Sequence, residues 1–132
     1  MPAQACWKRI LDLPMADIIQ PDICYIGGFT RALEVAQRAA DKGLYVTPHT
    51  ANWSLLLPFG LHYMAVVEKP WPLLENSIEE DRWSGTMYAE GGDNLMPVDG
   101  RIDVPTGPGW GMEISQEWMD DALHMESVTR NT

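Results

Sequence analysis

The chain has 132 residues, of which 45% are apolar, with six tryptophans and eight methionines, so it can build one domain with a hydrophobic core and is not disordered. Its formal charge of −10, with nine basic residues and no basic cluster, argues against nucleic acid and anionic membranes as partners. No apolar run reaches the roughly 18 residues of a membrane span and the N-terminus lacks signal-peptide features, so we expect a soluble, cytoplasmic protein.

The first elements form a helix, a strand and a second helix. Apolar residues at spacings of three and four predict a short amphipathic helix over Gln4–Leu13, which Pro14 ends. Ala16–Gln20 is expected to be a buried parallel strand. A stripe of small alanines then predicts a helix with Thr30 as its N-cap and Gly43 just past its end. The intervening glycine pair, Gly27-Gly28, indicates turn geometry and not a phosphate-binding loop.

A second strand and an unusually apolar helix follow. Leu44–Pro48 is the expected strand, and a helix opens at Ser54 or Pro58 and extends to about Val67. Its apolar content is too high for a one-sided surface helix, so it should be largely buried or lie at an interface. A third apolar run, Trp71–Glu75, has the same form as the first two strands.

The carboxyl-terminal part shows different signals. Residues 76–90 resemble a charged loop, and Asp99-Gly100 between two short runs predicts a β-hairpin. A final helix is expected over Ser115–His124 with Ser115 as N-cap, followed by a frayed tail over 125–132. His124 would then lie at the helix end, and His62 within the apolar helix would be a core or interface residue. Cys6 and Cys24 match no zinc spacing and are expected to be buried thiols in a reducing compartment.

Three polar residues close the three strand-like runs at nearly equal intervals. Asp22, His49 and Glu75 are 27 and 26 residues apart. One strand–helix unit of a (β/α)8 barrel takes about 25–35 residues, since eight units take roughly 250. We therefore expect the three side chains at the carboxyl ends of successive parallel strands, where barrel enzymes carry their catalytic groups. Taken singly, each has a structural explanation: a hydrogen-bonded histidine, a turn cap after Pro21, and a solvated acid.

The succession PDI, GGFTRALEVAQRA, YVTPHT, LLEN and DGRIDVPTGPGWG resembles the carboxyl-terminal third of the enolase superfamily, in its mandelate racemase-like, acid-sugar dehydratase branch. The resemblance extends over about Trp7 to Leu123. It implies an α/β fold: a partial TIM-type (β/α) barrel with the last three strand–helix units plus a hairpin and a helix. The expected division is the end of a preceding helix (1–14), three strand units (15–90), the hairpin and closing helix (91–124), and the tail (125–132).

The resemblance also implies roles for the strand-end residues. His49, oriented by Asp22, would take the proton alpha to a substrate carboxylate, and Glu75 would hydrogen-bond that carboxylate as it becomes an enediolate. A dehydratase then expels a hydroxyl as water, whereas a racemase returns a proton. Asn52 and Trp53, just past His49, would line the substrate pocket or contribute only packing.

The resemblance places the family's Mg²⁺ ligands and lysine base on earlier strands, which this chain lacks. No metal ligand is therefore predicted here, and we expect the chain alone to bind no tight Mg²⁺ and to be inactive. The expected partners are a small carboxylate or sugar-acid substrate, together with another copy of the chain or the missing part of the barrel. The alternative is a non-catalytic remnant that serves as an oligomerisation or binding module.

Overall fold

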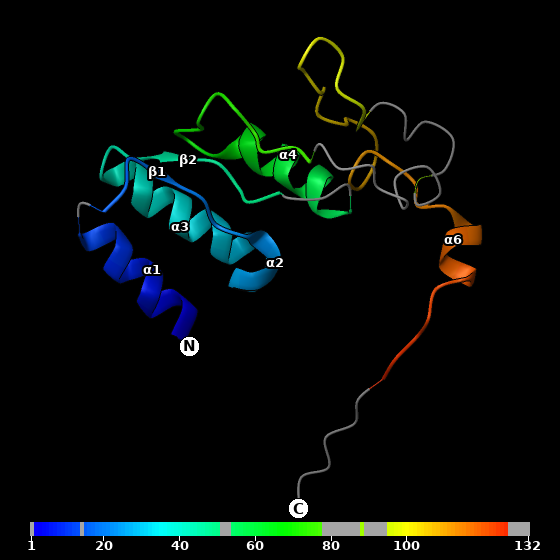
Figure 1. Cartoon of the computed structure of the whole chain (residues 1–132), viewed down its shortest axis with the longest axis horizontal. Coiled ribbons are helices and arrows are strands. Elements are labelled where there is room, and N and C mark those ends of the chain that lie inside the picture. The colour runs from blue at the N-terminus through cyan, green and yellow to red at the C-terminus, as the bar shows by residue number, and fades with distance from the viewer. Residues whose placement is uncertain (1, 14, 51–53, 78–87, 89–94, 127–132) are drawn as a thin grey trace, which may run out of the picture.

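The computed structural model describes residues 2–13, 15–50, 54–77, 88 and 95–126 (Figure 1). Its elements are α1 (Pro2–Asp12), β1 (Ile18–Ile19), α2 (Ile23–Ile26), α3 (Phe29–Asp41), β2 (Tyr45–Val46), α4 (Leu56–Val66) and α6 (Gln116–Asp120). The two strands run alongside α3, which lies between α1 and α4 (Figure 1). This is the strand–helix–strand–helix order of a parallel sheet covered by helices.

The sheet is parallel, as predicted, but its regular strands are short. Ile18 pairs with Tyr45 and Ile19 with Val46. A third segment joins through one parallel bridge, in which the N–H of Val46 donates to the carbonyl of Lys69 at 3.1 Å and the N–H of Trp71 donates to the carbonyl of Val46 at 2.8 Å. The strand predicted over Trp71–Glu75 is therefore a single bridge at Pro70. Lys69 and Trp71 face β2 in this register, and the next residue of the β2 segment that would donate across, Pro48, has no N–H, so the ladder does not continue.

Helix α3 buries the small residues that the sequence pattern singled out. Ala32, Val35, Ala36 and Ala39 are all buried. Gly43, just past the helix end, has φ +76°, as expected of the residue that follows a helix. The start of the helix was wrongly predicted, because the N-cap is Gly28 and not Thr30. Gly28 turns the chain with φ 106° and ψ 174°, a backbone conformation that essentially only glycine adopts.

Helix α2 was not predicted, because four residues are too few to show a helical period. It is defined by its two ends. The carboxylate Oδ1 of Asp22 accepts the N–H of Tyr25 at 2.9 Å, and Gly27 ends the helix in the left-handed conformation. The glycine pair is thus confirmed as turn geometry between α2 and α3.

Two apolar clusters make up the core. The larger joins α1, the strands, α2, α3 and α4, and includes Ile19, Val35, Val46 and Tyr63. The smaller packs Leu57 and Leu61 of α4 against Leu95 and neighbouring residues of the carboxyl-terminal part. Helix α4 contributes to both clusters, which confirms that it is largely buried.

The carboxyl-terminal predictions have mixed outcomes. Val98 and Arg101 form an antiparallel bridge around Asp99 and Gly100, whose φ angles of 50° and 73° confirm the hairpin turn. The hydroxyl of Ser115 accepts the N–H of Trp118, which confirms the N-cap. Helix α6 ends at Asp120, however, so placing His124 at a helix end was wrong.

The burial predicted for the two cysteines was also wrong. Cys6 and Cys24 are free and exposed, because each lies on the outer face of a helix. None of the helices in the described ranges is long and apolar enough to cross a membrane.

Candidate active site

The structure brings the three strand-end residues together. His49 Nδ1 lies 3.0 Å from Asp22 Oδ2, and His49 Nε2 lies 4.0 Å from Glu75 Oε2. All three follow the carboxyl ends of parallel segments. Their predicted proximity on one rim of the sheet is confirmed, whereas their catalytic roles remain a prediction.

The pairing between the first two strands places His49. Beyond β2, the N–H of Thr47 donates to the carbonyl of Ile19, and the N–H of His49 donates to the carbonyl of Pro21, both at 3.0 Å. The ladder therefore continues up to the residue before Asp22. Because Asp22 also caps α2 through Oδ1, its other oxygen is held towards the imidazole.

The pairing on the other side of β2 is different, because Pro48 has no N–H to continue a backbone ladder. Two threonine hydroxyls take the place of the backbone donors. Thr47 Oγ1 donates to the carbonyl of Leu73 at 2.9 Å, and Thr50 Oγ1 donates to the carbonyl of Glu75. The carboxylate of Glu75 is held as well. Its Oε2 accepts the N–H of Thr50 at 2.9 Å and the amide of Gln20 at 3.4 Å.

The contact with Asp22 decides which imidazole nitrogen can act as a base. Asp22 is an acceptor when ionised, so the neutral histidine keeps its proton on Nδ1 and has its lone pair on Nε2. Side-chain exposure is 13% for Asp22 but 43% for His49 and 37% for Glu75. The carboxylate of Asp22 is therefore shielded, while the side chains of His49 and Glu75 are accessible to a ligand.

A cavity of about 310 Å³ opens beside this group, lined by Trp7, Gln20, Asp22, Tyr25, Ile26 and His49. Trp7 on α1 and Tyr25 on α2 were not expected here. Neither follows a strand, so the strand-end argument could not find them. Cys24, next to Tyr25, has its pKa raised by partial desolvation and by the neighbouring Asp22 charge.

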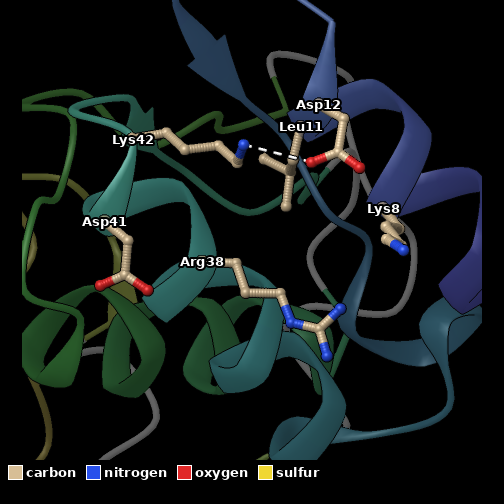
Figure 2. A pocket seen from close by; sticks show the side chains of 6 residues that line it. All are labelled: Lys8, Leu11, Asp12, Arg38, Asp41 and Lys42. Carbon is tan, nitrogen blue, oxygen red and sulfur yellow. Dashed lines mark ion pairs between the residues drawn. The ribbon is translucent and has the colours of Figure 1, made fainter.

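A second cavity, of about 400 Å³, lies between α1 and α3 and is shown in Figure 2. Its lining residues are Lys8, Leu11, Asp12, Arg38, Asp41 and Lys42. Lys42 and Asp12 form an ion pair at 3.2 Å across it. None of the three strand-end residues lines this cavity, so the smaller one is the candidate site.

Other predicted residues stand apart from the site. Asn52 and Trp53 lie outside the described residues. His62 is half-buried, and its Nε2 lies 2.9 Å from the carbonyl of Trp110. The Trp110 ring packs on Phe59 with centroids 4.6 Å apart, so the glycine-rich segment is docked on α4.

The described residues do not fit a magnesium site. They contain no group of three or more His, Cys, Asp or Glu side chains arranged to hold a metal ion. Asp22 is already committed to the α2 cap and to His49.

The chain is similar to a known protein family and to several curated proteins. The family described as "Enolase C-terminal domain-like" matches residues 4–118. D-galactarolactone cycloisomerase from Agrobacterium fabrum is 33% identical over 116 residues, which are 84% of this chain and 30% of that protein. D-galactonate dehydratase from Verminephrobacter eiseniae is 30% identical over 119 residues, or 83% of this chain and 29% of that protein.

Two solved structures also resemble this chain. A candidate racemase from Roseobacter denitrificans superposes with a TM-score of 0.82 at 39% identity, over 89% of this chain and 32% of that one. An enolase from Agrobacterium radiobacter, a candidate galactarate dehydratase with sodium and L-malate bound, gives a TM-score of 0.66 at 25% identity, over 94% of this chain and 34% of that one. The chain thus spans about a third of the length of the proteins it matches, and its fold is part of a TIM-type barrel. It belongs to the enolase C-terminal domain-like family.

Proposed function

We propose that this chain supplies the proton-transfer half of an enolase-type site that acts on sugar acids, as a dehydratase, cycloisomerase or racemase does. One observation carries the proposal: Asp22 holds Nδ1 of His49 at 3.0 Å, so that the lone pair of the neutral imidazole is on Nε2, which faces Glu75 across 4.0 Å. This is the arrangement of an oriented general base opposite a carboxyl group. The names of the relatives support sugar acids as the substrate class.

The chemistry of these residues is a carbon-acid deprotonation. His49 Nε2 takes the proton alpha to the substrate carboxylate, and the bonding electron pair moves into that carboxylate to give an enediolate. Asp22 stabilises the imidazolium that forms. Glu75, in its protonated form, donates a hydrogen bond to the carboxylate as its charge grows. In a dehydratase the enediolate then expels the beta-hydroxyl, which takes a proton from the His49 imidazolium and leaves as water. In a racemase a proton is returned to the other face of the α-carbon by an acid on the remaining barrel strands.

The remaining barrel strands are the partner that this proposal requires. Family members use Mg²⁺ to neutralise the substrate carboxylate. The described residues of this chain contain no group of side chains that could hold that ion. The chain spans 30% of the cycloisomerase and 32% of the candidate racemase. We therefore assign the metal to the part of the barrel that precedes this chain, either in the same polypeptide or in an associated one.

A chimera tests the proposal. In it, this chain replaces the matching third of the Agrobacterium cycloisomerase, and exchange of the substrate α-proton with deuterated solvent is followed by NMR. We expect exchange that falls by about 10²–10⁴-fold in His49→Ala. His124→Ala is the matched control, because His124 lies on an exposed segment beyond α6. Exchange that survives His49→Ala undiminished would contradict the proposal, because the proton would then be taken by a residue other than His49.

A further inference from the structure

We propose that Thr50 and Gln20 are positioning residues that decide which oxygen of Glu75 meets the substrate, an inference that rests on the proposed function. Both donate to the same atom. The backbone N–H of Thr50 lies 2.9 Å from Glu75 Oε2, and the Gln20 amide nitrogen lies 3.4 Å from it. In the described part of the chain, Oε1 makes no hydrogen bond.

The donors fix the location of a proton on Glu75. A backbone N–H and an amide NH₂ can only donate, so Oε2 must act as an acceptor towards both. The carbonyl oxygen of a protonated carboxyl is a stronger acceptor than its hydroxyl oxygen, so two donors at Oε2 favour the hydrogen of a protonated Glu75 on Oε1. The oxygen that can donate to a substrate carboxylate is then Oε1, while Oε2 stays bound to the protein.

Thr50 is held rigidly enough to play this role. It is 1% exposed, and its hydroxyl donates to the carbonyl of Glu75 while its N–H binds the carboxylate. Helix α4 supports it from the other side. A Cβ atom added at Gly60 would lie 2.6 Å from Thr50 Cγ2, so the bare backbone at Gly60 is what lets the threonine methyl sit there.

Thr47 provides a matched control. Its hydroxyl is also buried and donates to a carbonyl of the same segment, that of Leu73 at 2.9 Å, but it does not touch Glu75. Removal of either hydroxyl leaves one carbonyl without its donor. Only removal of the Thr50 hydroxyl releases the backbone of Glu75, the residue whose carboxylate lies at the candidate site.

The kinetic test uses the chimera. We expect Thr50→Val and Gln20→Leu to lower kcat for α-proton exchange, by up to about 10²-fold for Thr50→Val, with little change in KM. Thr50→Ser, which keeps the hydroxyl, should retain activity, and Thr47→Val should match the parent. Equal losses in Thr47→Val and Thr50→Val would overturn the proposal.

A rescue separates positioning from general damage. Gly60→Ala should lower kcat because its methyl displaces Thr50, although alanine favours the helix. Adding Thr50→Ser removes the methyl that collides and should restore kcat, since the next nearest atom, Pro48 Cγ, is 3.4 Å away. Failure of the double variant to recover would count against the role of Thr50.

An NMR arm does not depend on turnover. In the ¹⁵N-labelled chimera, the Thr50 amide resonance should move with pH, and Glu75→Gln should abolish that movement without affecting Thr47. A Thr50 resonance that ignores Glu75→Gln would overturn the positioning role, whatever the rate of α-proton exchange. If the Thr50 resonance responds to Glu75→Gln but the chimera shows no α-proton exchange, the positioning role of Thr50 stands and the proposed reaction is rejected.

Discussion

Asp22 divides its two carboxylate oxygens between folding and the candidate site. Oδ1 caps α2 by accepting the N–H of Tyr25, and Oδ2 orients His49. One residue thus fixes both the start of a helix and the tautomer of the base. The sequence suggested each role separately, as alternatives.

Substitution at Asp22 should separate these roles. Asparagine is as good an N-cap as aspartate, so Asp22→Asn should change the free energy of unfolding by less than about 0.5 kcal/mol, whereas Asp22→Ala should cost about 0.5–2 kcal/mol. The side-chain amide introduced by Asp22→Asn can donate to Nδ1 and so move the imidazole proton to Nε2, which should lower α-proton exchange by about 10²–10⁴-fold. Urea denaturation and the exchange assay measure the two effects. Loss of stability and activity in parallel would show that Asp22 acts only through folding.

The thiol of Cys24 reports on the charge of Asp22. Its pKa is raised first by partial desolvation and second by that carboxylate. Asp22→Asn removes the second cause, so the pKa should fall and a larger fraction of thiolate should be present at about pH 8. Iodoacetamide should then alkylate Cys24 faster in the variant, with Cys6 as the internal reference. An unchanged ratio of the two rates would contradict this account.

Tyr63 should make stability fall at alkaline pH. Its ring is fully buried, its hydroxyl donates to the carbonyl of Ala32 at 3.0 Å, and burial raises its pKa well above the usual value near 10. Above about pH 10 the unfolded chain releases this proton while the folded chain keeps it, so its contribution to stability is complete below that pH and is lost as pH rises. Relative to Tyr63→Phe, the free energy of unfolding should fall by up to about 1.4 kcal/mol per pH unit. Tyr25→Phe, at an 86% exposed position, should show no such difference from the parent.

At the scale of elements, the junction between α2 and α3 depends on two glycines. Gly27 ends α2 with φ +97°, and Gly28 starts α3 with φ +106° and ψ 174°. A Cβ at Gly28 would meet no atom within 4 Å, so only the backbone conformation requires glycine there. This junction sets the direction in which α3 leaves the site.

Gly28→Ala should therefore destabilise the fold by about 1–3 kcal/mol through backbone strain alone. Thr30→Ala is the control. Thr30 is exposed in the first turn of α3 and is not the cap that the sequence suggested, so its loss should cost less than about 0.5 kcal/mol. Chemical denaturation of the two variants compares them directly. A greater loss at Thr30 would restore it as the effective cap.

At the scale of the molecule, the sheet has two unpaired edges in the described part of the chain. Ile18 and Gln20 turn their backbone groups away from β2, as does Pro70 at the other edge. Tyr25 and Leu73 are 86% and 68% exposed. Unpaired strand edges and exposed apolar side chains favour association.

We therefore predict that the isolated chain self-associates, or requires the rest of the barrel to stay in solution. Light scattering of the purified chain at micromolar concentration measures this. Addition of the missing barrel segment should reduce self-association, because that segment competes for the same edges. A compact, cooperatively unfolding monomer would show that the chain buries these surfaces by itself.

The metal prediction also concerns the whole molecule. Because the described residues offer no cluster of three ligating side chains, calorimetry at millimolar Mg²⁺ should detect no stoichiometric site of micromolar affinity in the isolated chain. The chimera should have such a site, because it keeps the preceding barrel strands of the cycloisomerase. Tight binding by the isolated chain would require ligands on residues such as Glu79 that lie outside the described part.

The sequence alone determined those features that depend on local period and unit length. The alanine stripe predicted α3, Asp99-Gly100 predicted the hairpin turn, and nearly equal intervals predicted that Asp22, His49 and Glu75 would meet. Each follows from a rule that acts along the chain: about 3.6 residues per helical turn, a positive φ at a turn, and the length of one strand–helix unit.

Tertiary structure alone decided how side chains from different elements meet. It brought Trp7 and Tyr25 to the cavity, exposed both cysteines, and directed two donors to one oxygen of Glu75. Sequence spacing states which face of its own element a residue occupies, but not which neighbour that face meets. The two hydrogen bonds to Glu75 Oε2 depend on three segments packed together, and no pattern within one segment encodes them.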